Sequence, residues 1–90
     1  MNLKVFNWNI DKNEELKKKR GISFEEIVVA IHSNYIIEIY EHPNQSKYPG
    51  QKIYAIVYDD YVYLVPYVES ESELFLKTII PSRKATKKYL

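Results

Sequence analysis

The chain has 90 residues, no cysteine and a formal net charge of +1. This length allows one small domain over residues 1–90 and excludes two independent hydrophobic cores. The lack of cysteine excludes a disulfide framework and a cysteine-based metal site. The sequence shows neither a signal-peptide core nor a membrane-spanning apolar run, so we expect a cytoplasmic protein with no membrane partner.

The charge is distributed unevenly along the chain. Residues 1–20 have six Lys/Arg and three Asp/Glu, residues 21–76 have two and nine, and residues 77–90 have five and none. If the two cationic ends fold together, they form one basic patch suited to a polyanion. The alternative is that each end is only a solvated charged surface, and the sequence leaves both interpretations open.

The N-terminal part predicts a short strand followed by a charged helix. The strand covers residues 3–6 and the helix covers residues 12–20. Asp11 is expected to be the N-cap of this helix, because Glu14 follows it at capping-box spacing. Gly21 can adopt the left-handed conformation that ends a helix.

A second capping box marks the start of the next helix. Ser23 and Glu26 are three residues apart, so each side chain can accept a hydrogen bond from the backbone N–H of the other residue. Apolar residues at helical spacing then predict a helix over residues 24–33.

The remaining segments alternate between apolar and polar residues, which predicts strands. These strands cover residues 35–41, 52–58, 61–68 and 74–80, and a helix follows over residues 82–89. Asp59 and Asp60 are expected to form a tight hairpin turn. The order β-α-α-β-β-β-β-α with short connections favours an α+β fold, an antiparallel meander sheet with the helices packed on one face.

The last helix is the most informative segment of the sequence. Ser82 is placed to be its N-cap, and four cations follow at helical spacing: Arg83, Lys84, Lys87 and Lys88. A guanidinium beside the free N–H groups of a helix start is suited to binding a phosphate.

Several kinds of chemistry are excluded by what the chain lacks. Gly21 and Gly50 are its only glycines, so it has no phosphate-cradling glycine loop and no nucleophile elbow. His32 and His42 show no metal-ligand spacing, so we expect no metal site and no cofactor. The remaining cations, tyrosines and histidines suit metal-free cleavage of RNA, in which the 2′-hydroxyl of the substrate is the nucleophile.

Three segments of the chain carry a resemblance to a known family. Phe6–Trp8, Lys19–Glu26 and Ile80–Ala85 resemble, in the same order, motifs of the BrnT toxins, which are RelE-like ribonucleases of type II toxin–antitoxin systems. The resemblance extends along the whole chain. Three positions depart from the family pattern: Asn9 replaces an Asp, Arg20 replaces a His, and Pro81 replaces a small residue.

The resemblance implies a RelE/BrnT-like fold and an endoribonuclease that cleaves RNA and inhibits translation. It also implies a cognate antitoxin, a small DNA-binding protein that is often of the ribbon-helix-helix type, and a toxin–antitoxin hetero-oligomer. By position, Arg83 matches the arginine of the family's C-terminal motif, and Lys19 and Arg20 match its Lys-His pair.

We therefore predict a set of site residues on one surface. Arg83 is expected to stabilise the charge on phosphorus, with Lys52 and Lys77 assisting, and Tyr67 or His42 is expected to carry the proton. The backbone of the RNA is expected to contact Lys19, Arg20 and Lys84.

Two alternatives of other classes remain. The same basic patch could serve a non-catalytic module that binds nucleic acid or a protein. A tyrosine-rich sheet face could instead form a homodimer.

Overall fold

The computed structural model describes residues 4–90, which form an α+β structure with a mixed, open sheet. The elements along the chain are β1 (Val5–Trp8), α1 (Ile10–Arg20), α2 (Phe24–His32), β2 (Ile36–Glu41), β3 (Gln51–Tyr58), β4 (Tyr61–Glu69), β5 (Glu73–Leu76), β6 (Ile80–Pro81) and α3 (Arg83–Tyr89). Residue 3 of the predicted first strand lies outside the described residues. No helix within residues 4–90 is both long and apolar enough to cross a membrane.

The predicted β3–β4 hairpin is present and lies in the interior of the sheet. Asp59 and Asp60 form its two-residue turn, and both have positive φ angles, of 51° and 58°. Two successive positive φ angles define the turn type whose twist matches that of paired strands. The ladder then runs from Tyr58 opposite Tyr61 to Gln51 opposite Val68.

The prediction of a purely antiparallel meander is wrong at the other edge of the sheet. The spatial order is β1-β5-β4-β3-β2, and β1 pairs with β5 in parallel. Strand β1 therefore forms one edge of the sheet, where it pairs with β5, a strand that is distant from it in sequence. A pairing between segments so far apart leaves no local signal in the sequence.

The predicted strand over residues 74–80 is also split into two. The N–H of Lys77 donates to the carbonyl of Pro66 over 2.8 Å, but proline has no N–H with which to return the bond. The ladder between β4 and β5 stops at this point, and residues 77–79, which include the buried Ile79, belong to no strand. Pairing resumes at β6, where Ile80 lies opposite Leu64.

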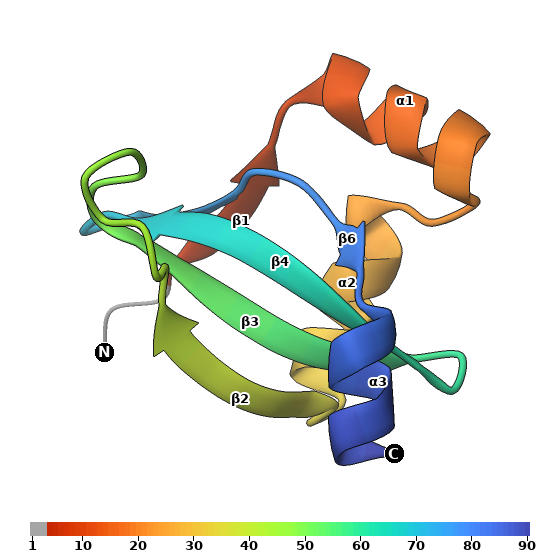
Figure 1. Cartoon of the computed structure of the whole chain (residues 1–90). Coiled ribbons are helices and arrows are strands. Elements are labelled where there is room, and N and C mark those ends of the chain that lie inside the picture. The colour runs from red at the N-terminus through yellow and green to blue at the C-terminus, as the bar shows by residue number, and fades with distance from the viewer. Residues whose placement is uncertain (1–3) are drawn as a thin grey trace.

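The helices cover both faces of the sheet, which corrects the expectation that they share one. Figure 1 shows α2 behind the sheet and α3 in front of it. The main core lies on the α2 side, where residues of α1, α2 and the alternate positions of β3, β4 and β5 meet: Leu16, Ile22, Phe24, Ile27, Ala30, Tyr54, Ile56, Val65, Tyr67, Leu76 and Ile79. The helix α3 has no buried residue and contributes none to this core.

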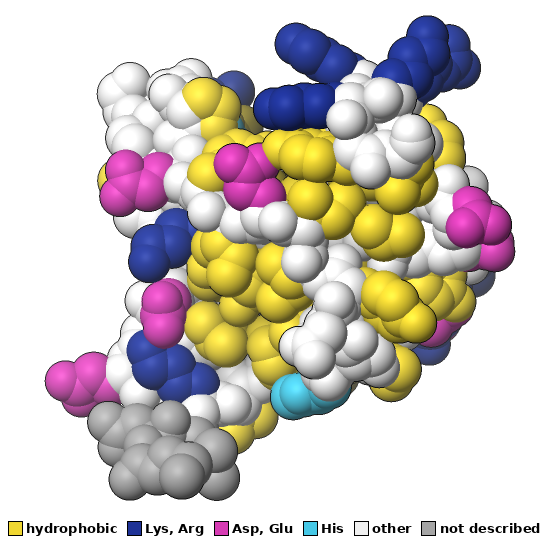
Figure 2. Space-filling model, turned by 90° about the horizontal axis from the view of Figure 1, so that it is seen from below, with side chains coloured by type: hydrophobic (Ala, Val, Ile, Leu, Met, Phe, Trp, Pro, Cys, Tyr) yellow, Lys and Arg dark blue, Asp and Glu magenta, His cyan; other side chains and the backbone are white. Residues whose placement is uncertain are grey.

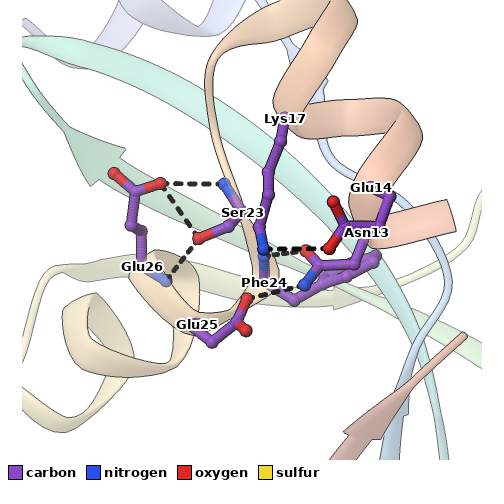
Figure 3. Close-up of polar contacts among 7 residues, drawn as sticks. All are labelled: Asn13, Glu14, Lys17, Ser23, Phe24, Glu25 and Glu26. Atoms are coloured by element: carbon purple, nitrogen blue, oxygen red, sulfur yellow. Dashed lines mark hydrogen bonds and ion pairs between the residues drawn. The ribbon is translucent and has the colours of Figure 1, made fainter. Parts of the chain in front are cut away.

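A buried polar network fixes α1 against the start of α2 (Figure 3). The Asn13 amide accepts from the Phe24 N–H over 2.8 Å and donates to the Glu25 carboxylate over 2.6 Å. The capping box of Ser23 and Glu26 is confirmed, with both reciprocal bonds present. Asn13 therefore ties two helix ends together through one side chain that is only 4% exposed.

The N-cap of α1 is Asn9 rather than the predicted Asp11. The Asn9 side chain accepts from the Lys12 N–H over 2.9 Å, and its backbone is extended. Asp11 lies in the first turn, where its charge is favourable beside the positive end of the helix dipole. Gly21 ends the helix with a φ of 65°, as predicted.

Candidate nucleic-acid interface

An open cleft of about 420 Å³ lies between α3 and the front face of the sheet. Its lining residues come from β2, β3, β4 and α3: Glu38, Tyr40, Ala55, Leu64, Ser82, Lys84, Ala85, Lys88 and Tyr89. Apolar side chains of Ala55 and Leu64 contribute from the central strands, whereas the charged groups come from β2 and α3. The cleft thus combines an apolar part with a charged rim.

Hydrogen bonds to a single residue of β4 hold α3 at this face. The Val62 carbonyl accepts from the Ser82 N–H, and the Val62 N–H donates to the Thr86 hydroxyl, each over 2.9 Å. The Thr86 hydroxyl in turn donates to the Ser82 carbonyl over 2.7 Å. The Ser82 side chain is the N-cap of α3, as predicted, and accepts from the Ala85 N–H.

The exposed side of α3 is cationic. Arg83, Lys84, Lys87 and Lys88 are all exposed, and the helix has no acidic residue. None of the ion pairs found in residues 4–90 involves these four cations. Figure 2 shows Lys and Arg side chains gathered at one margin of the molecule, beside an apolar surface. Unpaired cations on a short, fixed helix are available to bind an anionic ligand.

Lys77 shares this face of the sheet. Its neighbour Leu76 is buried in the α2-side core, so the alternation of side chains places Phe75 and Lys77 on the α3 side. The Lys77 ammonium lies 5.3 Å from the centre of the Phe75 ring, a cation–π contact. The predicted grouping of Lys77, Arg83 and Lys84 on one face is therefore compatible with the fold.

Tyr67 cannot carry a proton for these cations. It is 3% exposed, lies in the α2-side core, and stacks on Tyr54 with ring centres 4.1 Å apart. Burial raises the pKa of its hydroxyl far above the ordinary range, and the neighbouring Tyr54 adds to this effect. The prediction of Tyr67 as a proton carrier beside Arg83 is wrong because the two groups lie on opposite faces.

Lys52 is separated from Arg83 in the same way. It lies directly opposite Tyr67 in the β3–β4 ladder and so points to the α2 side. Its ammonium is 3.8 Å from a Glu69 carboxylate oxygen, and Glu69 also binds Lys4 at 2.6 Å. Lys52 therefore belongs to a surface ion-pair cluster rather than to the cleft.

His42 lies in the loop between β2 and β3, at the end of β3 away from α3 (Figure 1). Its ring packs against Tyr48 with centres 4.4 Å apart, and its Nδ1 accepts from the Asn44 N–H over 3.0 Å. These contacts give His42 a role in ordering the loop, and the fold does not bring it to Arg83.

Lys19 and Arg20 extend from the end of α1, which packs on the α2 side of the sheet. The Lys19 ammonium already pairs with Glu15 at 3.1 Å on its own helix. Because α3 lies on the other side, the two cationic ends of the chain do not form the single patch considered from the sequence (Figure 1). Lys19 and Arg20 are therefore not neighbours of the cleft.

Sequence reasoning missed Glu38, Tyr40 and Tyr89 as members of a site, and it named Lys88 only as one of the cations of the last helix. The Tyr89 hydroxyl donates to the Glu38 carboxylate, although 51 positions separate the two residues. Burial raises the pKa of Tyr40, and the adjacent Glu38 carboxylate raises it further. The alternation of β2 does put Glu38 and Tyr40 on the same face, but nothing local indicates that α3 covers this face.

Comparison of the chain with protein-family models, with curated proteins and with solved structures gives no match. Within residues 4–90, no group of three or more His, Asp or Glu side chains is arranged to hold a metal ion. The function is therefore inferred from the residues of the α3 face and from their chemistry.

Proposed function

We propose that this protein is a metal-independent endoribonuclease toxin of a type II toxin–antitoxin system, with a RelE/BrnT-like fold, which cleaves RNA and inhibits translation. The observation that carries the proposal is the α3 face. There, Lys84 lines the cleft, and Arg83 and Lys77, which are not among the lining residues, belong to segments that the fold holds on the same side of the sheet. A cytoplasmic location and a small DNA-binding antitoxin, of the ribbon-helix-helix type, are parts of the same proposal.

The chemistry requires little beyond positive charge and proton transfer. RNA supplies its own nucleophile, the 2′-hydroxyl, and the protein stabilises the extra negative charge that develops on phosphorus. Preorganised cations commonly provide the largest part of such stabilisation. The Arg83 guanidinium can donate two parallel hydrogen bonds to phosphate oxygens, which a lysine cannot do.

The test uses the full chain and a 5′-labelled RNA in the presence of EDTA. We expect new fragments with 5′-hydroxyl ends, and we expect Arg83→Gln to lower the single-turnover rate by about 10²–10³-fold, as for removal of one transition-state donor. Lys47→Gln is the matched control, because it removes one exposed cation from the distant β2–β3 loop. Equal rates for Arg83→Gln and the control would remove Arg83 from the mechanism.

A second candidate function is a non-catalytic module that binds RNA through the same face. One observation favours it: neither Tyr67 nor His42, the proton carriers predicted from the sequence, lies next to Arg83. The same RNA experiment separates the two functions. Retained binding with no new 5′-hydroxyl ends at high protein concentration would favour the module.

A further inference from the structure

Cleavage of RNA by its own 2′-hydroxyl needs a group that accepts the hydroxyl proton. If the chain has the proposed ribonuclease function, one of its groups must accept this proton. Within the cleft, Glu38 is the one carboxylate among the lining residues, all of which belong to the described part of the chain. It is exposed to solvent at the rim, so a bound ligand can reach it.

The surroundings of Glu38 suit an anionic substrate. Lys84 and Lys88 are four residues apart, on the same side of α3, and both line the cleft opposite β2. The Tyr89 hydroxyl donates to one Glu38 carboxylate oxygen, which leaves the second oxygen available as an acceptor. Tyr40 lies on the same face of β2 as Glu38. With Lys84, Lys88 and Tyr89, it makes up the titratable groups that line the cleft around Glu38.

We propose that the cleft between α3 and the sheet is a catalytic site for single-stranded RNA, in which the Glu38 carboxylate accepts the proton of the 2′-hydroxyl. The O2′–H bond breaks, O2′ forms a bond to phosphorus, and the P–O5′ bond breaks to leave a 2′,3′-cyclic phosphate. The leaving 5′-oxygen takes a proton from an ammonium group of the cleft, Lys84 or Lys88. Solvent then restores the proton of the ammonium and removes the proton from Glu38.

The size and lining of the cleft select this class of substrate. A cleft of about 420 Å³ is far too small for a double helix, so it can hold only a short unpaired segment. The rings of Tyr40 and Tyr89 offer surfaces on which an unpaired base can stack. DNA lacks the 2′-hydroxyl on which the reaction depends, so it can bind in the cleft without being cleaved.

The test compares Glu38→Gln with Glu41→Gln in the full chain. Both variants remove one carboxylate from an exposed position of β2, but Glu41 lies opposite Lys52 and points to the other face. We expect Glu38→Gln to lower the single-turnover cleavage rate by about 10²–10⁴-fold, as for the loss of a general base. Its affinity for RNA, measured with a 2′-deoxy oligonucleotide that cannot be cleaved, should stay the same or rise because a negative charge is lost.

The pH profile separates proton transfer from positioning. Wild-type cleavage should decline on acidification as a carboxylate becomes protonated, and this acidic limb should disappear in Glu38→Gln. Tyr89→Phe removes the hydrogen bond to Glu38 while keeping the carboxylate, so it should retain the limb. A Tyr89→Phe variant without the limb would show that Glu38 acts through Tyr89, and it would overturn the assignment of Glu38 as the base.

The remaining outcomes are also decisive. Cleavage by Glu38→Gln at the rate of Glu41→Gln would overturn this inference and leave the proposed ribonuclease function intact. Binding of RNA without cleavage by the wild-type chain would overturn the proposed function itself, and the inference with it. Unfolding curves of both variants check that neither substitution acts through the fold.

Discussion

The two faces of the sheet differ in what their residues contribute. On the α2 face, Phe24, Ile27, Ile56 and Val65 are completely buried. On the α3 face, Ala55 and Val62 are also buried, but the covering helix has no buried residue of its own and leaves an open cleft with charged groups at its rim. The comparison indicates that the α2 face holds the larger core, whereas part of the α3 face is open to a ligand. Residues of the same type therefore have different roles on the two faces.

The tyrosines illustrate this difference most clearly. Tyr54 and Tyr67 stack within the core and are 6% and 3% exposed. Tyr40 and Tyr89 line the cleft, where they are only partly buried and lie beside Glu38. The core tyrosines supply apolar area, whereas the cleft tyrosines keep ring surface partly exposed and, at Tyr89, use the hydroxyl to bind Glu38.

The largest expected effect is a loss of stability when a core residue of the α2 face is replaced. Phe24 is completely buried and stacks on Trp8 with ring centres 5.6 Å apart. Phe24→Ala removes this contact and leaves a cavity, which should lower the free energy of unfolding by about 3–5 kcal/mol. Urea unfolding followed by circular dichroism measures the loss.

Val29→Ala provides the control for Phe24→Ala. Val29 lies on the same helix but is 64% exposed, so its replacement should change the free energy of unfolding by less than about 0.5 kcal/mol. Similar losses for the two variants would contradict the view that the α2 face carries the stability of the fold.

The next effect concerns the polar junction that holds α1 on the α2 face. Asn13→Ala leaves the buried Phe24 N–H without its acceptor, which should cost about 1–3 kcal/mol in the free energy of unfolding. Asn7→Ala is a suitable comparison, because Asn7 is also an asparagine but is exposed. A loss for Asn13→Ala no larger than that for Asn7→Ala would show that the junction contributes little.

The parts of the fold that the sequence predicted well depend on local signals. The capping box of Ser23 and Glu26, the turn of Asp59 and Asp60, and the stop at Gly21 each depend on residues a few positions apart. Such signals act before the tertiary structure forms, so they can be recognised from a single sequence.

The α3 face was predicted poorly because its site depends on contacts between distant segments. Glu38 and Tyr89 meet only after β6 has paired with β4 and α3 has turned onto the front of the sheet. Tyr67 was assigned to the wrong face for the same reason. The alternation of β4 divides its residues into two sets, but it does not indicate which set α2 covers.

A smaller effect should appear in the pH dependence of stability. The hydrogen bond from Tyr58, supported by those from Ser23, lowers the pKa of Glu26 below its ordinary value of 4.5 although partial burial opposes this change. A carboxyl whose pKa is lower in the folded state contributes stability that is fully present above the unfolded value. This contribution is lost as the pH falls through the folded value.

Tyr58→Phe tests this contribution. It removes the hydroxyl donor, so the free energy of unfolding should be lower at pH 7 and should fall less steeply below pH 4.5 than in the wild type. Tyr61→Phe is the control, since no hydrogen bond from the Tyr61 hydroxyl is present within residues 4–90. An unchanged slope in Tyr58→Phe would assign the acid sensitivity to another carboxylate.

The smallest effect distinguishes the two cationic ends of the chain. In single-stranded RNA binding, each lost phosphate contact reduces the slope of log K against log salt by about 0.7. The double variant Lys84→Gln/Lys88→Gln should therefore reduce the slope by about 1.4, if each lysine contacts one phosphate. Lys19→Gln/Arg20→Gln removes the same charge from the end of α1 and should leave the slope unchanged, because α1 lies on the other side of the sheet.

Fluorescence titration of a labelled 2′-deoxy oligonucleotide at several salt concentrations measures both slopes. The oligonucleotide is not cleaved, so the comparison reports binding alone and applies equally to a ribonuclease and to a binding module. Equal reductions for the two double variants would mean that RNA extends from α3 around the edge of the sheet to α1. The binding surface would then include both cationic ends. The two faces of the sheet would in that case differ in how much they bury, but not in whether they bind RNA.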